Sequence, residues 1–301
     1  MVALGGGSAM DTAKALLVLA ADDSDDIAPY FFGGSKQIPA LAPLLCLPTT
    51  AGTGAEATFV AIITHAAEKC LLRDTRLAPR LALIDPALTV TMPPSVTVSS
   101  GLDALSHALE ALTSRLANPF CDTLALDALA RIARALPRVL DEGSDLAARS
   151  EMSLAALNAG LAFVNARVHL GHAVGHSLGT YFTLPHGFAC VLCLPAILDF
   201  LREPCAPALQ RAAYVLGTDD AARGTAHLMA QVGAPGVGQA TGVTTADIPL
   251  LIGIVEREER LIGLSPRRPD ARDWERIFAT SWGGTRCGSR WRRGPHHVGL
   301  C

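Results

Sequence analysis

The stretch "SSGLDALSHALEAL" (residues 99–112) places an aspartate and a histidine four positions apart in an otherwise apolar segment. Residues four apart lie on the same face of an α-helix, so Asp103 and His107 can point at one object. The leucines of the stretch occupy a different stripe, which can enter a hydrophobic core. The stretch therefore predicts a buried helix that carries two polar groups on one face.

A second polar cluster follows in "ARVHLGHAVGHSLGTYFTLPHG" (residues 166–187). His172 and His176 are again four apart, and His186 follows after a loop that contains Pro185. A carboxylate together with three imidazoles is the ligand inventory that suits Fe²⁺ or Zn²⁺. A single histidine is more often a hydrogen-bonded core or surface group, so this spacing leaves a metal site and ordinary structural histidines both open.

Two loops rich in small residues follow expected strands in the first third of the chain. "VALG" (residues 2–5) reads as a short strand that enters "GGGS" (residues 5–8), and the helical pattern after it has Ser8 as its expected N-cap and Asp11 in its first turn. Such a turn can present backbone N–H groups to a phosphate, although a simple tight turn explains it equally well. The second loop, "PTTAGTGAEAT" (residues 48–58), also follows a strand. The pair predicts the walls of a nucleotide site at one edge of a sheet, without the usual GxGxxG fingerprint.

The patterning divides the chain into three parts. Residues 1–92 alternate strand, helix and strand, which favours an α/β domain with parallel strands, and Pro93 and Pro94 mark a boundary. Residues 93–265 are expected to be all helical, with helices over 95–114, 119–141, 147–176 and 186–202, and mostly helical structure over 207–260. Residues 266–301 form an atypical tail. Its last stretch, "TSWGGTRCGSRWRRGPHHVGLC" (residues 280–301), is more typical of a solvated or disordered segment than of a nucleic-acid-binding arm.

Composition excludes several classes of protein. The chain has 301 residues, of which half are hydrophobic, and its formal net charge is −3, so no global attraction to nucleic acid or to an acidic membrane is expected. No apolar run is long enough for a transmembrane helix, and the N-terminus does not resemble a signal peptide, so we expect a cytoplasmic location. Cys190 and Cys193 form the one CxxC pair, which lies in an apolar run and is interpreted as two buried thiols.

With these motifs in view, the chain resembles the iron-containing (group III) alcohol dehydrogenases, which share a two-domain fold with glycerol dehydrogenase and dehydroquinate synthase. The resemblance runs from Gly5 to about residue 265. Its landmarks are "GGGSAMDTAK", "PTTAGTGAEAT", "IDPALTVTMPPSVTVSSGLDALSHALE" and "GHAVGHSLGTYFTLPHG". The resemblance implies a dehydroquinate synthase-like fold, α/β followed by all-α, in which a nucleotide-binding domain precedes a helical metal-binding domain.

The same resemblance implies an NAD(P)-dependent alcohol dehydrogenase that transfers hydride between a nicotinamide cofactor, NAD or NADP, and a small alcohol or carbonyl compound. It implies Fe²⁺ or Zn²⁺ as the metal, and a chain that could form homo-oligomers, with no nucleic-acid or membrane partner. His176 matches a position that lines the substrate pocket and can relay a proton. The implied metal ligands are Asp103, His107, His172 and His186. The implied cofactor-binding residues are Gly5, Gly6, Gly7, Ser8, Asp11, Thr49, Thr50 and Thr53.

The chain departs from the family pattern at both ends, because it begins one strand before the glycines and its last residues carry no recognisable family helices. A truncated nucleotide-binding domain is therefore expected, and a remnant that binds metal without turnover is one alternative. The other is a metal-free reductase similar to maleylacetate reductase. Members of that group resemble "GMNAIAH" and "LPHAE" where this chain has "GLDALSH" and "LPHGF", so Asp103 and Gly187 favour the metal-dependent branch.

Overall fold

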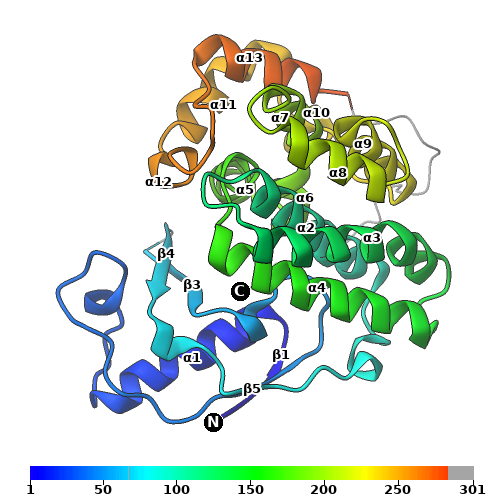
Figure 1. The fold of residues 1–301 in the computed structure, drawn as a ribbon. Coiled ribbons are helices and arrows are strands. Elements are labelled where there is room, and N and C mark those ends of the chain that lie inside the picture. Colours follow the sequence, from blue (N-terminus) through cyan, green and yellow to red (C-terminus); the bar gives the residue numbers. More distant parts are fainter. Residues whose placement is uncertain (67, 284–301) are drawn as a thin grey trace.

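The computed structural model describes residues 1–66 and 68–283, and within them the strands precede residue 83 while the later regular structure is helical (Figure 1). The strands are β1 (Val2–Gly5), β2 (Leu45–Pro48), β3 (Val60–His65), β4 (Glu68–Arg73) and β5 (Leu81–Ala82). The helices are α1 (Gly7–Ala21), α2 (Pro94–Thr113), α3 (Pro119–Asp141), α4 (Leu146–Ala166), α5 (Leu170–Tyr181), α6 (His186–Val191), α7 (Leu194–Phe200), α8 (Ala206–Val215), α9 (Ala221–Gln231), α10 (Val237–Thr241), α11 (Ile248–Val255), α12 (Glu259–Ile262) and α13 (Ala271–Thr280). The expected division into domains at residue 92 stays a prediction.

The first sheet is parallel, as the sequence predicts. β2 lies between β1 and β5, and its pairing with β1 runs from Val2 opposite Leu45 to Gly5 opposite Pro48. Helix α1 packs on this sheet through Met10 and Leu17, both of which are buried with Cys46. Glycine loops thus follow β1 and β2 at the same edge, because the strands are parallel and in register.

The second sheet, an antiparallel pair of β3 and β4, was not expected from the sequence. Its two faces have different environments: Ala61 and Leu72 are fully buried against the end of α1, whereas the opposite face lines a cavity. The strands join through Ala66, whose φ of 48° places it in the left-handed region. Both faces carry mixed residue types, so the alternation that marks an ordinary amphipathic strand is absent.

The start of α1 corrects one expectation. The helix begins at Gly7 with Gly6 as its N-cap and no side-chain cap, so Ser8 is inside the helix and does not cap it. Asp11 lies beyond the first turn and its carboxylate accepts a hydrogen bond from the backbone N–H of Ile62 at 3.0 Å. The N–H groups of the first turn are therefore left without a side-chain acceptor.

The helical part is organised around α2, which is buried along most of its length and packs against α3 and α4 (Figure 1). Leu102, Leu105 and Leu109 are fully buried, which agrees with the stripe expected from the sequence. The α/β part approaches this bundle very closely at Gly52 and Gly54: a Cβ on Gly52 would lie 2.5 Å from the carbonyl oxygen of Ser100 on α2, and one on Gly54 would lie 2.6 Å from the Cα of Gly160 on α4. Gly54 also has a φ of 63°, so this position favours glycine for two reasons.

Two of the expected helices are each divided in two. The segment 147–176 breaks between α4 and α5 at Arg167, whose φ is 71°, because the buried carboxylate of Glu110 accepts the N–H groups at the start of α5. The segment 186–202 breaks between α6 and α7, and Pro195 occupies the first turn of α7. Helical periodicity continues across both breaks, so it did not reveal them.

After residue 265 the sequence showed no recognisable helix of the family, but the structure contains helix α13 there. Asp270 caps this helix with a hydrogen bond from the N–H of Asp273, and Trp274 and Phe278 are fully buried in the main core. The capping box and the three-and-four spacing of the apolar residues were the signals that could have identified it. The last part of the tail, residues 284–301, lies outside the described residues.

No helix among the described residues is both long and apolar enough to cross a membrane.

Candidate metal centre and nucleotide cleft

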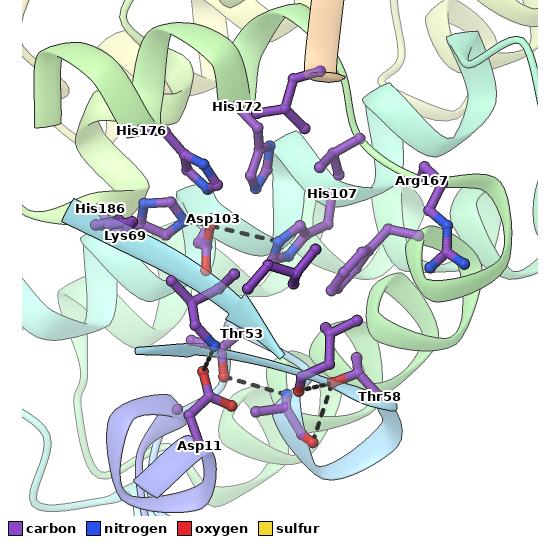
Figure 2. A pocket seen from close by; sticks show the side chains of 18 of the residues that line it. Asp11, Thr53, Thr58, Lys69, Asp103, His107, Arg167, His172, His176 and His186 are labelled. Carbon is purple, nitrogen blue, oxygen red and sulfur yellow. Dashed lines mark hydrogen bonds and ion pairs between the residues drawn. The ribbon is translucent and has the colours of Figure 1, made fainter. Parts of the chain in front are cut away.

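Three helices bring the predicted polar residues together at one end of a cavity (Figure 2). Asp103 and His107 come from α2, His172 and His176 from α5, and His186 is the first residue of α6. The Oδ1 of Asp103 lies 3.8 Å from Nε2 of His107 and 3.7 Å from Nε2 of His186. The stacked rings of His107 and His172 have centroids 4.8 Å apart.

Several atoms of this cluster are buried and lack a hydrogen-bond partner, which is the condition expected of metal ligands. They include Oδ1 of Asp103 and Nε2 of His172. Buried polar atoms are normally paired, and leaving one unpaired costs about 1–3 kcal/mol. A divalent cation would satisfy a carboxylate oxygen and an imidazole nitrogen together, so the donor set fits a metal.

A fully buried carboxylate orients one of these imidazoles. The Oε2 of Glu110 is in short contact with Nδ1 of His172, while Oε1 accepts the N–H groups of His169 at 2.9 Å and Gly171 at 2.8 Å. Burial raises the pKa of Glu110, and His169 and these N–H groups oppose that rise. With Glu110 ionised, Nδ1 of His172 carries the proton and Nε2 presents its lone pair to the cluster, as metal-binding histidines require.

Burial keeps the imidazoles neutral. It lowers the pKa of His107 to about 4 and of His186 to about 3, against opposition from Glu110 and Asp103 respectively. Burial also places the pKa values of His172 and His176 well below the usual value of 6.5. Neutral imidazoles are the form that binds a metal, so the cluster is suited to a cation near neutral pH.

The tightest group of donor atoms differs by one member from the set that the resemblance implies. Donor atoms of Asp103, His172, His186 and Cys190 all lie within 4.8 Å of one another. His107 lies outside this group and its ring stacks on Phe163, with centroids 4.0 Å apart. Cys190 is fully buried, as predicted for the CxxC thiols. It lies one helical turn after His186 on α6, and this spacing is the signal in the sequence that could have placed it in the donor group.

His176 lies beside the cluster. Its ring centroid is 6.0 Å from that of His172 and 5.6 Å from that of His186, and its side chain lines the cavity. It is half-buried and makes contact with both neighbouring imidazoles, so it lies where it could exchange a proton with a bound molecule.

The cavity, of about 380 Å³, extends from this cluster to the start of α1. Of the residues expected to bind a nucleotide, Gly7, Ser8, Asp11 and Thr53 line it. The other four lie just behind, where the N–H of Thr49 donates to the carbonyl of Gly5, and a Cβ on Gly6 would lie 3.2 Å from Thr50. The hydroxyl of Thr50 is buried without a partner, so the open N-terminus of α1 and a free hydroxyl meet at this end.

A buried lysine that the sequence did not assign holds the second loop. The Nζ of Lys14 donates to the carbonyls of Ala55 at 2.8 Å, Thr58 at 3.0 Å and Val60 at 2.7 Å. Burial lowers the pKa of Lys14, and Asp11 opposes that effect. The lysine thus fixes the backbone that leads from the nucleotide loop into β3.

Comparison with known proteins agrees with this geometry. A family model described as "Iron-containing alcohol dehydrogenase" matches residues 1–86, and one described as "Fe-containing alcohol dehydrogenase family, C-terminal" matches residues 97–282. The chain belongs to the iron-containing alcohol dehydrogenase family. The resemblance is thereby confirmed, but it extends beyond residue 265, through α13.

The family contains relatives of moderate identity. "Probable alcohol dehydrogenase EutG" of Escherichia coli is 38% identical over 240 residues, which cover 77% of this chain and 60% of that protein. The "NAD-dependent methanol dehydrogenase" of Bacillus methanolicus is 38% identical over 202 residues, or 66% of this chain and 52% of that protein. The chain therefore spans about three fifths or less of the length of these two relatives.

Solved structures confirm the fold class. A structure of 1,3-propanediol oxidoreductase matches with a TM-score of 0.86 at 29% identity, covering 93% of this chain and 76% of that one. Sulfoacetaldehyde reductase from Bifidobacterium kashiwanohense in complex with NAD⁺ matches with a TM-score of 0.85 at 31% identity, covering 93% and 75%. The two-domain fold of the iron-containing alcohol dehydrogenases is thus the fold of this chain.

Proposed function

We propose that the chain is a metal-dependent alcohol dehydrogenase, or aldehyde reductase, that transfers hydride between a nicotinamide cofactor and a small alcohol or carbonyl compound. One observation carries the proposal: a single cavity is lined at one end by unpaired metal-ligand atoms and at the other by the open N-terminus of α1. A metal and a phosphate-bearing cofactor would therefore face the same cavity.

The names of the relatives support a nicotinamide cofactor. The Bacillus methanolicus relative is called NAD-dependent, and the structure of the Bifidobacterium reductase contains NAD⁺. We infer that this chain uses NAD or NADP, with Gly5 to Ser8 at the pyrophosphate and the threonines 49, 50 and 53 beside it. The cytoplasmic location and homo-oligomerisation stay predictions.

Asp103, His172 and His186 are the residues that would hold the metal, with His107 or Cys190 as a fourth ligand. A divalent metal at this place supplies a Lewis acid that polarises the oxygen of a carbonyl or alcohol, and the nicotinamide supplies or accepts the hydride. Glu110 keeps the proton of His172 on Nδ1, which leaves Nε2 free to act as a ligand.

Other residues of the cavity would prepare the reaction. His176 is neutral and lines the cavity, so it can accept the proton of an alcohol or return it to the product. Ile62 and Leu71, which are paired across the β3–β4 hairpin, and Leu261 give the cavity an apolar wall. That wall would exclude water from the site of hydride transfer.

The test is aldehyde-dependent loss of NADH or NADPH absorbance by the metal-loaded chain. We expect turnover by the native protein and by Asp127→Asn, a change of the same kind on α3 at a residue that does not line the cavity, and none by Asp103→Asn. Absence of turnover in a folded, metal-loaded chain with either cofactor would refute the proposal. Full activity of Asp103→Asn would instead indicate a metal-free reductase.

A further inference from the structure

Four cationic side chains from three segments that are distant in the sequence line the cavity. Lys69 and Arg73 project from β4 on the face shared with Leu71, Arg167 lies between α4 and α5, and Arg260 is on α12. Within residues 1–66 and 68–283, none of the four forms an ion pair within 4.0 Å. Other arginines of the chain do form such pairs, as Arg131 and Arg211 show.

Few negative charges oppose these cations. Two carboxylates line the cavity: Asp11, which accepts a hydrogen bond from the N–H of Ile62, and Asp103, which lies within the histidine cluster. Glu258 lies close enough to interact with Lys69 and Arg260, and Asp103 interacts with Lys69. These four cations outnumber Asp11, Asp103 and Glu258, so the cavity carries a net positive charge before any metal is bound, and such a cleft concentrates anions.

Arg167 is the most constrained of the four. Its φ of 71° is unusual for a residue with a side chain, and it places a half-buried guanidinium over the ring of Phe59, 5.1 Å from the centroid. One of its N–H groups donates to the carbonyl of Val164 at 2.6 Å. Burial, Arg73 and Arg260 all lower its pKa, so three like charges lie near one another, and none of them has a carboxylate within 4.0 Å among the described residues.

We infer that the substrate carries an anionic group of the carboxylate kind, which Arg167 binds with Arg73 and Arg260 while the reacting oxygen faces the histidine cluster. The inference rests on the proposed function and names the substrate class of that site. A guanidinium suits this role because its planar N–H groups can bind an oxyanion at two points. Figure 2 shows Arg167 on the wall that carries His107, across the cavity from Asp11. The cofactor's pyrophosphate is expected at the start of α1, beside Asp11, so the arginines remain available to substrate.

The first experiment measures binding without turnover. Calorimetry on the zinc-loaded chain compares succinate with 1,4-butanediol, which has the same carbon chain but no charge. We expect succinate to bind at least about tenfold more tightly, because a charge-assisted pair contributes about that factor. The preference should fall about tenfold in Arg167→Gln and in Arg167→Gly, which tolerates the positive φ, and should remain in Arg211→Gln, a surface control.

The second experiment measures kcat/KM for succinic semialdehyde and butyraldehyde, two four-carbon aldehydes that differ in charge. The ratio should favour the anionic aldehyde and fall about tenfold in both Arg167 variants. If both aldehydes lose activity equally and the KM for the cofactor rises, the arginines bind cofactor phosphates and the inference is overturned. Equal binding of succinate and butanediol would also overturn it. An inactive chain that binds succinate through Arg167 would refute the proposed function alone.

Discussion

Exchange of Glu110 for glutamine should leave the fold intact and weaken metal binding, because it changes which nitrogen of His172 carries a proton. In the native chain the carboxylate of Glu110 accepts backbone N–H groups through Oε1 and faces Nδ1 of His172 through Oε2. In Glu110→Gln the amide oxygen can keep the backbone bonds, and the amide NH₂ takes the place of Oε2. That NH₂ group donates to Nδ1, so the proton of His172 moves to Nε2 and points into the metal cluster.

The magnitude follows from the hydrogen bonds. To bind a metal, His172 of the variant must return its proton to Nδ1, where it would face a second donor in a fully buried place. Loss of one buried hydrogen bond costs about 1–3 kcal/mol, which is a factor of about 5–150 in affinity. Effects of about 10–100-fold are typical when a partner of a metal-binding histidine is removed. The free energy of unfolding of the metal-free chain should change by only about 1 kcal/mol, because the backbone bonds remain.

The assay is competition for Zn²⁺ against a chelator of known affinity, with urea unfolding of the metal-free chain measured in parallel. Thr113→Val is the matched control. Thr113 lies on α2, as Glu110 does, and its hydroxyl contacts Nε2 of His169 at 3.0 Å but does not touch His172. We expect the control to retain metal affinity. A Glu110→Gln chain that binds Zn²⁺ as tightly as the native chain would show that the reasoning about the tautomer is wrong.

Three further predictions concern stability, each measured by urea unfolding. Lys14→Met should lower the free energy of unfolding by about 3 kcal/mol, because three carbonyls lose their common donor. Lys36→Met, which removes an exposed ion pair, should lower it much less, and equal losses would contradict the anchoring role of Lys14. Gly54→Ala should lower the free energy of unfolding more than Gly242→Ala does. Both glycines have a positive φ, but a Cβ at Gly242 would meet open space, whereas one at Gly54 would clash with α4. The reverse order would be evidence against the close contact at Gly54. With the metal removed by a chelator, the free energy of unfolding should fall as the pH is lowered from 7 to 5. Histidines of the unfolded chain have a pKa near 6.5 and take up protons in this range. Buried His107 and His186, with pKa values of about 4 and 3, do not. Each of these two histidines should lower the free energy of unfolding by about 2 kcal/mol at pH 5. A free energy of unfolding that does not change between pH 7 and pH 5 would contradict their burial in the neutral form.

Much of the fold could be predicted from the sequence because the decisive features are local. The parallel strand "VALG", the glycine turn after it and the buried leucine stripe of α2 depend on spacing within one element. The grouping of Asp103 with His107 also follows from a helical turn. Their meeting with His172 and His186 does not, since those residues lie on other helices, and the resemblance to a known family supplied that step.

The features that were missed depend on contacts distant in the sequence. The break before α5 exists because Glu110 reaches its N–H groups from α2, and no pattern within residues 147–176 contains that information. One face of the β3–β4 hairpin packs against the core and the other lines the cavity, so the strands do not alternate simply between apolar and polar residues. Cys190 joins the donor group only because α6 packs against α2 and α5.

The most direct test of the proposed metal centre is a crystal of the zinc- or iron-loaded chain, measured with X-rays at the absorption edge of the metal. We predict one anomalous peak within bonding distance of Asp103, His172 and His186, with either His107 or Cys190 completing the set. A folded chain with no peak there, or with its metal bound only at another place, would contradict the account.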